Sequence, residues 1–589
     1  MSFWNAEDKV PISQTKISIP AQHGLEYSPG QKCEFHIPPS IGFLQPRESY
    51  LNIGVKISDP GLSSEAIRLQ LDAQTGGQVL IKDLRIYSGG AGRILLEEYQ
   101  NYNVFTALKY DYETNDSIKA KRGLTEGATV YSQQCRSDHG MPQTQQNNAT
   151  ENPYYKPYPV SASFSAPMTN GSYTEVKCLL PLNTGLFSNE KIFPVAMTEG
   201  LVVEMIFEDA RKVMRTLDTT NRHRHLQANP FFMSQNGSNS GPTFPAADNA
   251  SAFREFFVRR DNSMGSAGSI KNFPFAIGER VGFFNASDGL DNPSSGFGEA
   301  NPKVERLEYV AGTTNAIKVR LNGSFRPTRV LNQEHVLYSR TVLDAATFAP
   351  TYTITDAHFV IQKVEMPPGY TTKLASMMKS GGAMNYDFLS ATNYKISQLK
   401  SERVANLRLP LTQSRAKSIL CIPTDASASG IKDLVNASTT YTECYDLGTD
   451  ATDHPWNVNH SQRTGLTGCV DNLSAYQLFY DGKLNPSRKV FTTKLASKKS
   501  VDAQPLIELE KALVMSGIKP FSLQSFRENF CLGRALSLQN GVYDARGKDF
   551  ALQVEYTESD APTVDKLWMN WCVHLRRIVI KGDSIALEI

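Results

Sequence analysis

The chain has 589 residues, of which 61 are lysine or arginine and 59 are aspartate or glutamate, so its formal net charge is +2. This length exceeds what one hydrophobic core holds, and we expect two or three large domains. Hydrophobic residues make up 40% and charged residues 20%, a globular composition that excludes a wholly disordered chain. Proteins that bind nucleic acid through its phosphates show a basic excess, which is missing here, so we expect no direct nucleic-acid binding.

The N-terminal residues carry no sign of a secretion signal. Glu7 and Asp8 stand where such a signal needs basic residues followed by an apolar run. No stretch approaches the roughly 18 apolar residues of a membrane-spanning helix, so we expect no membrane insertion. These features favour a protein made in a cytosol-like compartment. Its eight cysteines contain no C-x-x-C pair and are expected to be buried free thiols.

The chain begins with a polar stretch and then turns to strand patterns. Residues 1–18 have no hydrophobic period and predict an extended N-terminal arm. Residues 51–57 alternate between apolar and other side chains, which predicts a half-buried strand. Gly76-Gly77 precedes a second strand, predicted at 79–86. A short amphipathic helix is expected next, because apolar residues recur at spacings of four and three: Leu95, Tyr99, Tyr102 and Phe105.

Two further strands are predicted within Cys178–Asp209, after a polar loop at 113–165. The first alternates at Cys178, Leu180 and Leu182, and the second runs from Leu201 to Phe207. Proline gives a sheet no N–H donor, so Pro181 predicts an edge or bulge position for the first strand. Residues 210–300 are rich in Asn, Gly, Ser and Pro with aromatic islands, which predicts an ordered excursion from the first domain. The insertion is expected to span about 210–345.

The second half of the chain repeats the strand-rich character. Thr351–Met366 is predicted as the last strand of the first domain, and Pro367-Pro368-Gly369 as the crossing into the second. New strands are expected from Met384, at Ala475–Pro486 around an Asp481-Gly482 turn, and from Trp568 to the C-terminus. One strong helix is predicted at Pro505–Ser516, with proline at its start and glycine after its end.

Three polar motifs invite a functional interpretation. Ser88–Arg93 (SGGAGR) follows a predicted strand and opens a predicted helix, which would suit a phosphate-binding loop. It lacks both the Gly-Lys-Ser/Thr ending and the G-x-G-x-x-G spacing of such loops, so a plain turn is favoured. Ser380–Ala383 (SGGA) favours a loop. Arg222-His223-Arg224-His225 offers two imidazoles, yet the flanking arginines repel a metal cation, so a solvated loop is favoured. We therefore assign no catalytic, cofactor-binding or metal-binding residues and expect no cofactor.

Other polar and aromatic residues give no catalytic constellation. His358 and His574 lie in strand patterns and are expected at strand surfaces. No pair of carboxylates is singled out by its spacing. The sequence therefore neither supports nor excludes the two catalytic carboxylates of a glycosidase. Trp568 and Trp571 fit either core packing or the wall of a sugar site. An alternative function is therefore a cytosolic β-sandwich protein that binds or cleaves glycans.

An ordered series of segments resembles one protein family. The series comprises Gly76-Gly77 with the strand and helix after it, Leu180-Pro181-Leu182 through Phe207, Ala475–Pro486, and Leu567–Ile589. In order and spacing it resembles the double jelly-roll major capsid proteins of virophages, polinton-like viruses and large DNA viruses. The resemblance implies an all-β fold of two tandem eight-stranded jelly rolls with short helices and long loop insertions. The expected domains are an arm at 1–18, a first roll at 19–366 with the insertion at about 210–345, and a second roll at 367–589.

The same resemblance implies a function. A family member would be a structural protein and not an enzyme, and would assemble as pseudo-hexagonal trimeric capsomers in an icosahedral virus shell. Its partners would be further copies of itself, with penton and minor capsid proteins beside them. It would reside in the virion after synthesis in the host cytoplasm or a virus factory. Because Trp568–Ile589 reads as core strand to its end, we expect no removal of a C-terminal tail.

Overall fold

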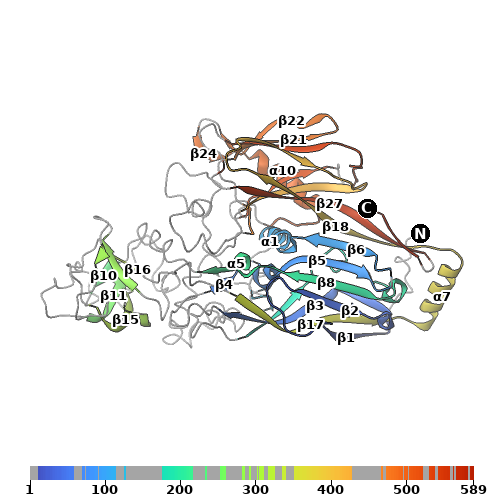
Figure 1. Cartoon of the computed structure of the whole chain (residues 1–589), viewed down its shortest axis with the longest axis horizontal. Helices are drawn as coiled ribbons and strands as arrows, with labels where there is room; N and C mark the ends of the chain where they lie inside the picture. The colour runs from blue at the N-terminus through green and yellow to red at the C-terminus, as the bar shows by residue number, and fades with distance from the viewer. Residues whose placement is uncertain are drawn as a thin grey trace.

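The structure is a computed structural model of the chain (Figure 1). It describes residues 11–58, 69–72, 75–90, 92–113, 122, 125–127, 175–216, 232–234, 253–259, 281–285, 291–292, 302, 304–310, 316–325, 335–339, 351–426, 466–468, 473–494, 497–501, 503–521, 529–536, 541–556, 562, 565–581 and 584–588.

The first half of the chain forms a sandwich of two four-stranded antiparallel sheets, which we call roll 1. One sheet has the order β1 (Ser13–Pro20), β17 (Thr351–Glu365), β3 (Phe43–Ser58), β7 (Val176–Pro181). The other has the order β2 (Lys32–Ile37), β8 (Leu201–Phe207), β5 (Ile81–Ser88), β6 (Leu95–Gln100). Counted along the chain, these eight strands are arranged as 1-8-3-6 facing 2-7-4-5, which is the double Greek key of a jelly roll.

The second half repeats this topology in roll 2. Its first sheet has the order β18 (Met384–Gln398), β27 (Lys566–Lys581), β20 (Ala416–Asp425), β25 (Leu532–Ala535), and β28 (Ser584–Glu588) also pairs with β27. Its second sheet has the order β19 (Val404–Leu409), β26 (Phe550–Tyr556), β21 (Leu473–Tyr480), β22 (Lys483–Phe491). The arrangement is again 1-8-3-6 facing 2-7-4-5. The predicted all-β double jelly roll is therefore confirmed by strand order.

The alternating sequence patterns explain why these segments become strands. Leu51, Ile53, Val55 and Ile57 of β3 are all fully buried, and Leu201, Val203, Met205 and Phe207 of β8 face the same core. Because side chains alternate across a strand, each pattern places one apolar face between the two sheets. The predicted edge position of Pro181 is confirmed, since β7 is the outer strand of its sheet.

Two features of roll 1 differ from the sequence prediction. The helix expected over Leu95–Phe105 was wrong: Leu95–Gln100 is strand β6, and α1 (Tyr102–Glu113) begins after a turn at Asn101, whose φ is 56°. The spacing of four and three arose because Leu95 and Tyr99 lie in the strand, whereas Tyr102 and Phe105 lie in the helix that follows the turn. The strand expected at 79–86 begins later, because Gly76–Leu80 forms a buried 3-10 turn, η4.

The predicted arm and crossing also need correction. Residues 13–18 belong to β1, which pairs with β17 from Ser13 to Pro20, so they do not form an arm. The crossing after β17 contains a helix, α7 (Pro368–Lys379), which lies at one end of the molecule (Figure 1). Pro368 stands in its first turn, where a missing N–H costs nothing. The predicted outer limits of the two rolls stay a prediction.

The remaining elements lie in the insertion and around both rolls. The described strands of the insertion lie beyond the end of roll 1 opposite α7 (Figure 1). They form a four-stranded sheet, β10 (Phe232–Ser234), β11 (Phe253–Arg259), β15 (Ala316–Phe325) and β14 (Val304–Val310), and a three-stranded sheet, β13 (Asp291–Asn292), β12 (Val281–Asn285) and β16 (His335–Ser339). Short elements complete the chain: β4 (Leu69–Leu71), β9 (Met214–Thr216), α5 (Ala210–Val213), η2 (Pro39–Ile41), η7 (Val195–Thr198), β23 (Thr493–Lys494), β24 (Ser497–Val501) and α10 (Gln504–Met515).

Two local predictions in roll 2 are confirmed. The helix expected at Pro505–Ser516 is α10, which packs Leu509, Ala512 and Leu513 into the core. The expected Asp481-Gly482 turn joins β21 to β22, and both residues have positive φ, 54° and 70°. Glycine and aspartate tolerate this conformation, which matches the twist of the hairpin.

Candidate functional site

The two rolls meet over a buried interface. In roll 1 it is formed by β6, α1 and the loop at 182–193, and in roll 2 by β18, β27 and the segments around 516–521 and 529 (Figure 1). Two aromatic pairs join the rolls. Phe105 lies 5.7 Å from Trp571 between ring centroids, and Phe193 meets Tyr386 edge-on at 5.0 Å. Such pairs add about 0.5–1.5 kcal/mol beyond the area they bury.

Side-chain hydrogen bonds fix the relative position of the rolls. Four of them end on a backbone carbonyl of the other roll: Tyr386 Oη donates to Lys191 O (2.9 Å), Asn189 Nδ2 to Asp387 O (3.0 Å), Asn393 Nδ2 to Gln100 O (3.2 Å) and Arg576 Nη2 to Leu95 O (3.5 Å). Because carbonyls are held by the sheets and turns, each bond specifies one placement of one roll against the other.

A second group of polar contacts lies at the C-terminal end of α1. Asn529 Nδ2 donates to Asp111 Oδ2 at 2.7 Å, and Tyr112 Oη donates to the carbonyl of Asn529 at 3.1 Å. The backbone N–H of Phe521 donates to the carbonyl of Tyr112 at 2.8 Å. Asp111, Tyr112 and Asn529 are all buried, so these bonds satisfy groups that have no access to water.

Glu97 places a carboxylate in the buried interface. Its side chain is fully buried and accepts hydrogen bonds from the backbone N–H groups of Gly185 (2.8 Å) and Leu186 (2.9 Å). Burial raises the pKa of Glu97, although these N–H groups and the positive charge of Arg576 oppose the rise. Gly185 must be glycine here, because an added Cβ would lie 1.8 Å from the carbonyl oxygen of Leu389 in β18.

His574 is also buried, which contradicts its predicted place at a strand surface. Its exposed fraction is 0%, and its Nε2 lies 3.0 Å from Thr392 Oγ1 on the neighbouring strand. Burial lowers the pKa of His574 to about 4, and the nearby Arg576 guanidinium lowers it further. At this position β27 is an inner strand, because His574 pairs with Ser390 of β18 on one side and with Ala416 of β20 on the other. His358, in contrast, is partly exposed beside Asp356, as predicted.

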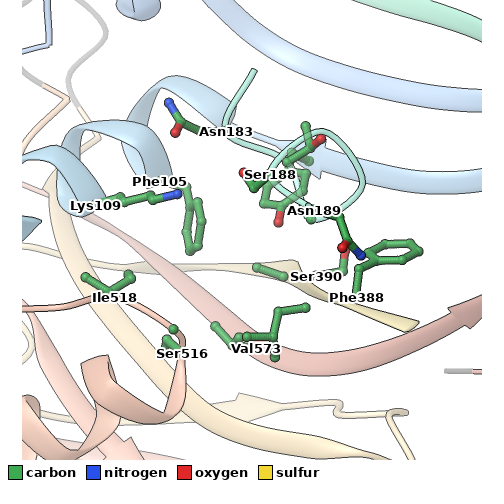
Figure 2. A pocket seen from close by; sticks show the side chains of 16 residues that line it. Phe105, Lys109, Asn183, Ser188, Asn189, Phe388, Ser390, Ser516, Ile518 and Val573 are labelled. Carbon is green, nitrogen blue, oxygen red and sulfur yellow. The ribbon is translucent and has the colours of Figure 1, made fainter. Parts of the chain in front are cut away.

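A cavity of about 260 Å³ lies between the rolls (Figure 2). Phe105, Phe388, Leu389, Ile518 and Val573 give it apolar walls, and asparagine, serine and threonine side chains of the 183–189 loop line the other side. Lys109 is the one charged residue of this lining. Figure 2 shows its side chain extending from α1 with the nitrogen toward Phe105.

The described residues of the two glycine-rich motifs form turns. Ser88–Arg93 joins β5 to β6, so it does not open a helix, as the sequence had suggested. The N–H of Gly89 lies 3.1 Å from the carbonyl of Thr198 and 3.0 Å from that of Gly200, which turns it away from any phosphate. Ser380 and the glycines after it follow α7 as a turn, with φ of 81° at Gly381. Arg222–His225 lies outside the described residues.

The described residues include no group of three or more His, Cys, Asp or Glu that would hold a metal ion. None of the helices in the described part of the chain is long and apolar enough to cross a membrane. Five cysteines are described and all are buried free thiols, as predicted: Cys33, Cys178, Cys421, Cys531 and Cys572. Cys135, Cys444 and Cys469 lie outside the described ranges.

Both tryptophans considered for a sugar site are fully buried. Trp568 Nε1 donates to Gln398 Oε1 at 2.7 Å within roll 2, and Trp571 packs on Phe105 at the roll interface. Neither ring is available to stack on a sugar. The packing interpretation is therefore the one that the structure bears out.

Comparison with known proteins gives structural likenesses only. No protein-family model and no curated protein matches the chain. Among solved structures, the chain is similar to the Faustovirus major capsid protein (TM-score 0.46, 9% identity, 96% of this chain and 90% of that chain). It is similar to PBCV-1 VP54 fitted into a reconstruction of the virophage Sputnik (0.45, 8%, 100% and 99%) and to the mavirus major capsid protein (0.36, 8%, 98% and 90%). At these TM-scores and identities, the double jelly roll rests on the strand order of this chain itself.

Proposed function

We propose that this chain is the major capsid protein of a virus, and that it self-assembles into trimeric, pseudo-hexagonal capsomers of an icosahedral shell. In this role it is a structural protein without catalytic activity. Its partners are further copies of itself and, beside them, penton and minor capsid proteins. It is located in the virion and is made in the host cytoplasm or a virus factory.

One observation carries the proposal: the chain contains two sandwiches of identical strand order that pack against each other over a buried interface. Three copies of such a chain, arranged around a three-fold axis, place six similar sandwiches around a centre. Six similar units approximate six-fold symmetry, which lets copies tile a flat facet. The interface through Phe105, Trp571, Phe193 and Tyr386 keeps the two units in one relative position.

The distribution of loops and charge supports the same role. The insertion strands β10–β16 lie beyond one end of roll 1, which leaves the sides of the sandwich for contacts with neighbouring copies (Figure 1). Long loops are tolerated there, because closing a loop costs entropy that grows only slowly with length. The net charge of +2 is typical of a shell protein that does not bind the genome, because a genome-binding protein needs a basic excess.

Light scattering after size-exclusion chromatography, with negative-stain electron microscopy, tests the proposal. We expect a mass of about 196 kDa, three times 65.3 kDa, and hexagonal outlines in the micrographs. A stable monomer at protein concentrations of about 50 µM would overturn the trimer, because obligate interfaces persist at such concentrations. A glycan array with a hydrolase screen tests the alternative role, and saturable glycan binding there would favour it.

A further inference from the structure

The cavity between the rolls has a lining that suits one class of ligand. Its volume of about 260 Å³ lies just below the roughly 300–1,000 Å³ of drug-sized ligand sites, so it fits a smaller molecule. Phe105, Phe388 and Val573 provide an apolar wall drawn from both rolls. Concave sites with apolar walls and a few polar groups are where proteins bind small molecules.

The lining of the cavity carries a single positive charge and no negative charge. Lys109 is the one charged residue, and no aspartate or glutamate lines the cavity. Among the residues that the structure describes, none forms a hydrogen bond or ion pair with the Lys109 ammonium. Its side chain is half-buried beside Phe105, with the polar Asn183 and Ser188 on the opposite side (Figure 2). A half-buried ammonium without a protein partner favours an anion close by.

We propose that this cavity binds a small amphipathic carboxylate, with the carboxylate at Lys109 and the apolar body against Phe105, Phe388 and Val573. Because both rolls line the cavity, the ligand contacts both at once and stabilises their relative position. This site goes beyond the capsid role and does not depend on it. Binding to the chain is measured directly, whether or not the chain assembles.

Isothermal titration calorimetry of the full chain with 4-phenylbutyrate tests the site. The neutral 4-phenyl-1-butanol has the same apolar body and serves as the ligand control. We expect one saturable site per chain with a Kd below about 1 mM, and binding of the alcohol weaker by about tenfold or more. No saturable binding of the carboxylate up to about 5 mM, or equal binding of the alcohol, overturns the proposal.

Three variants locate the site on the chain. Lys109→Met removes the ammonium and keeps the length of the side chain, and we expect binding about tenfold weaker. Ser188→Trp narrows the cavity from an exposed loop position and should weaken binding at least as much. Lys373→Met in α7 changes an exposed lysine outside the lining and should bind like the wild type. Unchanged binding in both lining variants would place the ligand elsewhere and refute the site, and circular dichroism confirms that each variant is folded.

Discussion

Replacing His574 by glutamine should remove a specific acid sensitivity of the chain. His574 is fully buried in β27 and stays neutral, with its Nε2 beside Thr392 Oγ1 and the positive charge of Arg576 nearby. Glutamine keeps a polar side chain at this position but cannot take up a proton in this pH range. The difference between wild type and variant therefore isolates the protonation of this one imidazole.

The magnitude follows from the two pKa values of His574. The pKa is 6.5 in the unfolded chain and about 4 in the folded one. Because the folded pKa is the lower one, the stability from a neutral His574 is complete above pH 6.5. It is lost as the pH falls toward 4, since the unfolded chain takes up the proton first. At about 1.36 kcal/mol per pKa unit, the loss amounts to roughly 2 kcal/mol between pH 7 and pH 5 and roughly 3 kcal/mol by pH 4.

Urea titrations at pH 7, 6 and 5 measure this difference for wild type and His574→Gln. All other titrating groups are common to the two proteins and cancel. We expect the wild type to lose about 2 kcal/mol more than the variant between pH 7 and pH 5. Ser28→Gln, at an exposed position, removes and adds no titrating group, so it is the control and should lose as much as the wild type. Equal losses in wild type and His574→Gln would refute the reasoning.

Three further outcomes test the packing of the chain. Gly185→Ala should lower the free energy of unfolding in urea by at least about 2 kcal/mol, because the new Cβ would lie 1.8 Å from Leu389 O. Gly92→Ala, whose Cβ would meet no atom within 4 Å, is the control and should change it by less than about 0.5 kcal/mol. Phe193→Ala should cost about 3–5 kcal/mol, because the ring is fully buried against roll 2, and an unchanged urea midpoint would contradict that packing. Mass spectrometry of assembled particles should find residues 584–588 retained, because β28 pairs with β27, and a mass lacking them would count against this.

Strands were predictable wherever one face of a segment was apolar over many residues. The alternation in β3, β8 and β17 is local and needs no knowledge of the partner strand. The spacing over Leu95–Phe105 misled for the same local reason. It spans a strand, a turn at Asn101 with positive φ and the start of a helix, and nothing in the residue pattern separates these three.

The roll interface was not predictable from the sequence. Leu95 and Arg576 are separated by 481 residues, so no local pattern brings them together. A weak signal exists in the closing strand, where Asn570, His574, Arg576 and Arg577 interrupt an apolar run, and a charged residue within such a run needs a partner.

The buried polar groups of this interface explain why the two rolls keep one relative position. Burying Glu97 and Arg576 costs desolvation, and an apolar interface of the same area would be as stable or more so. An apolar interface, however, tolerates small sliding movements, because its contacts have no direction. The N–H groups of Gly185 and Leu186 point at Glu97 in only one placement of the loop, and Gly185 in turn contacts the backbone of β18. We therefore expect the buried charges to fix the relative position of the two rolls at some cost in stability. An assembly built from repeated units requires such a fixed position.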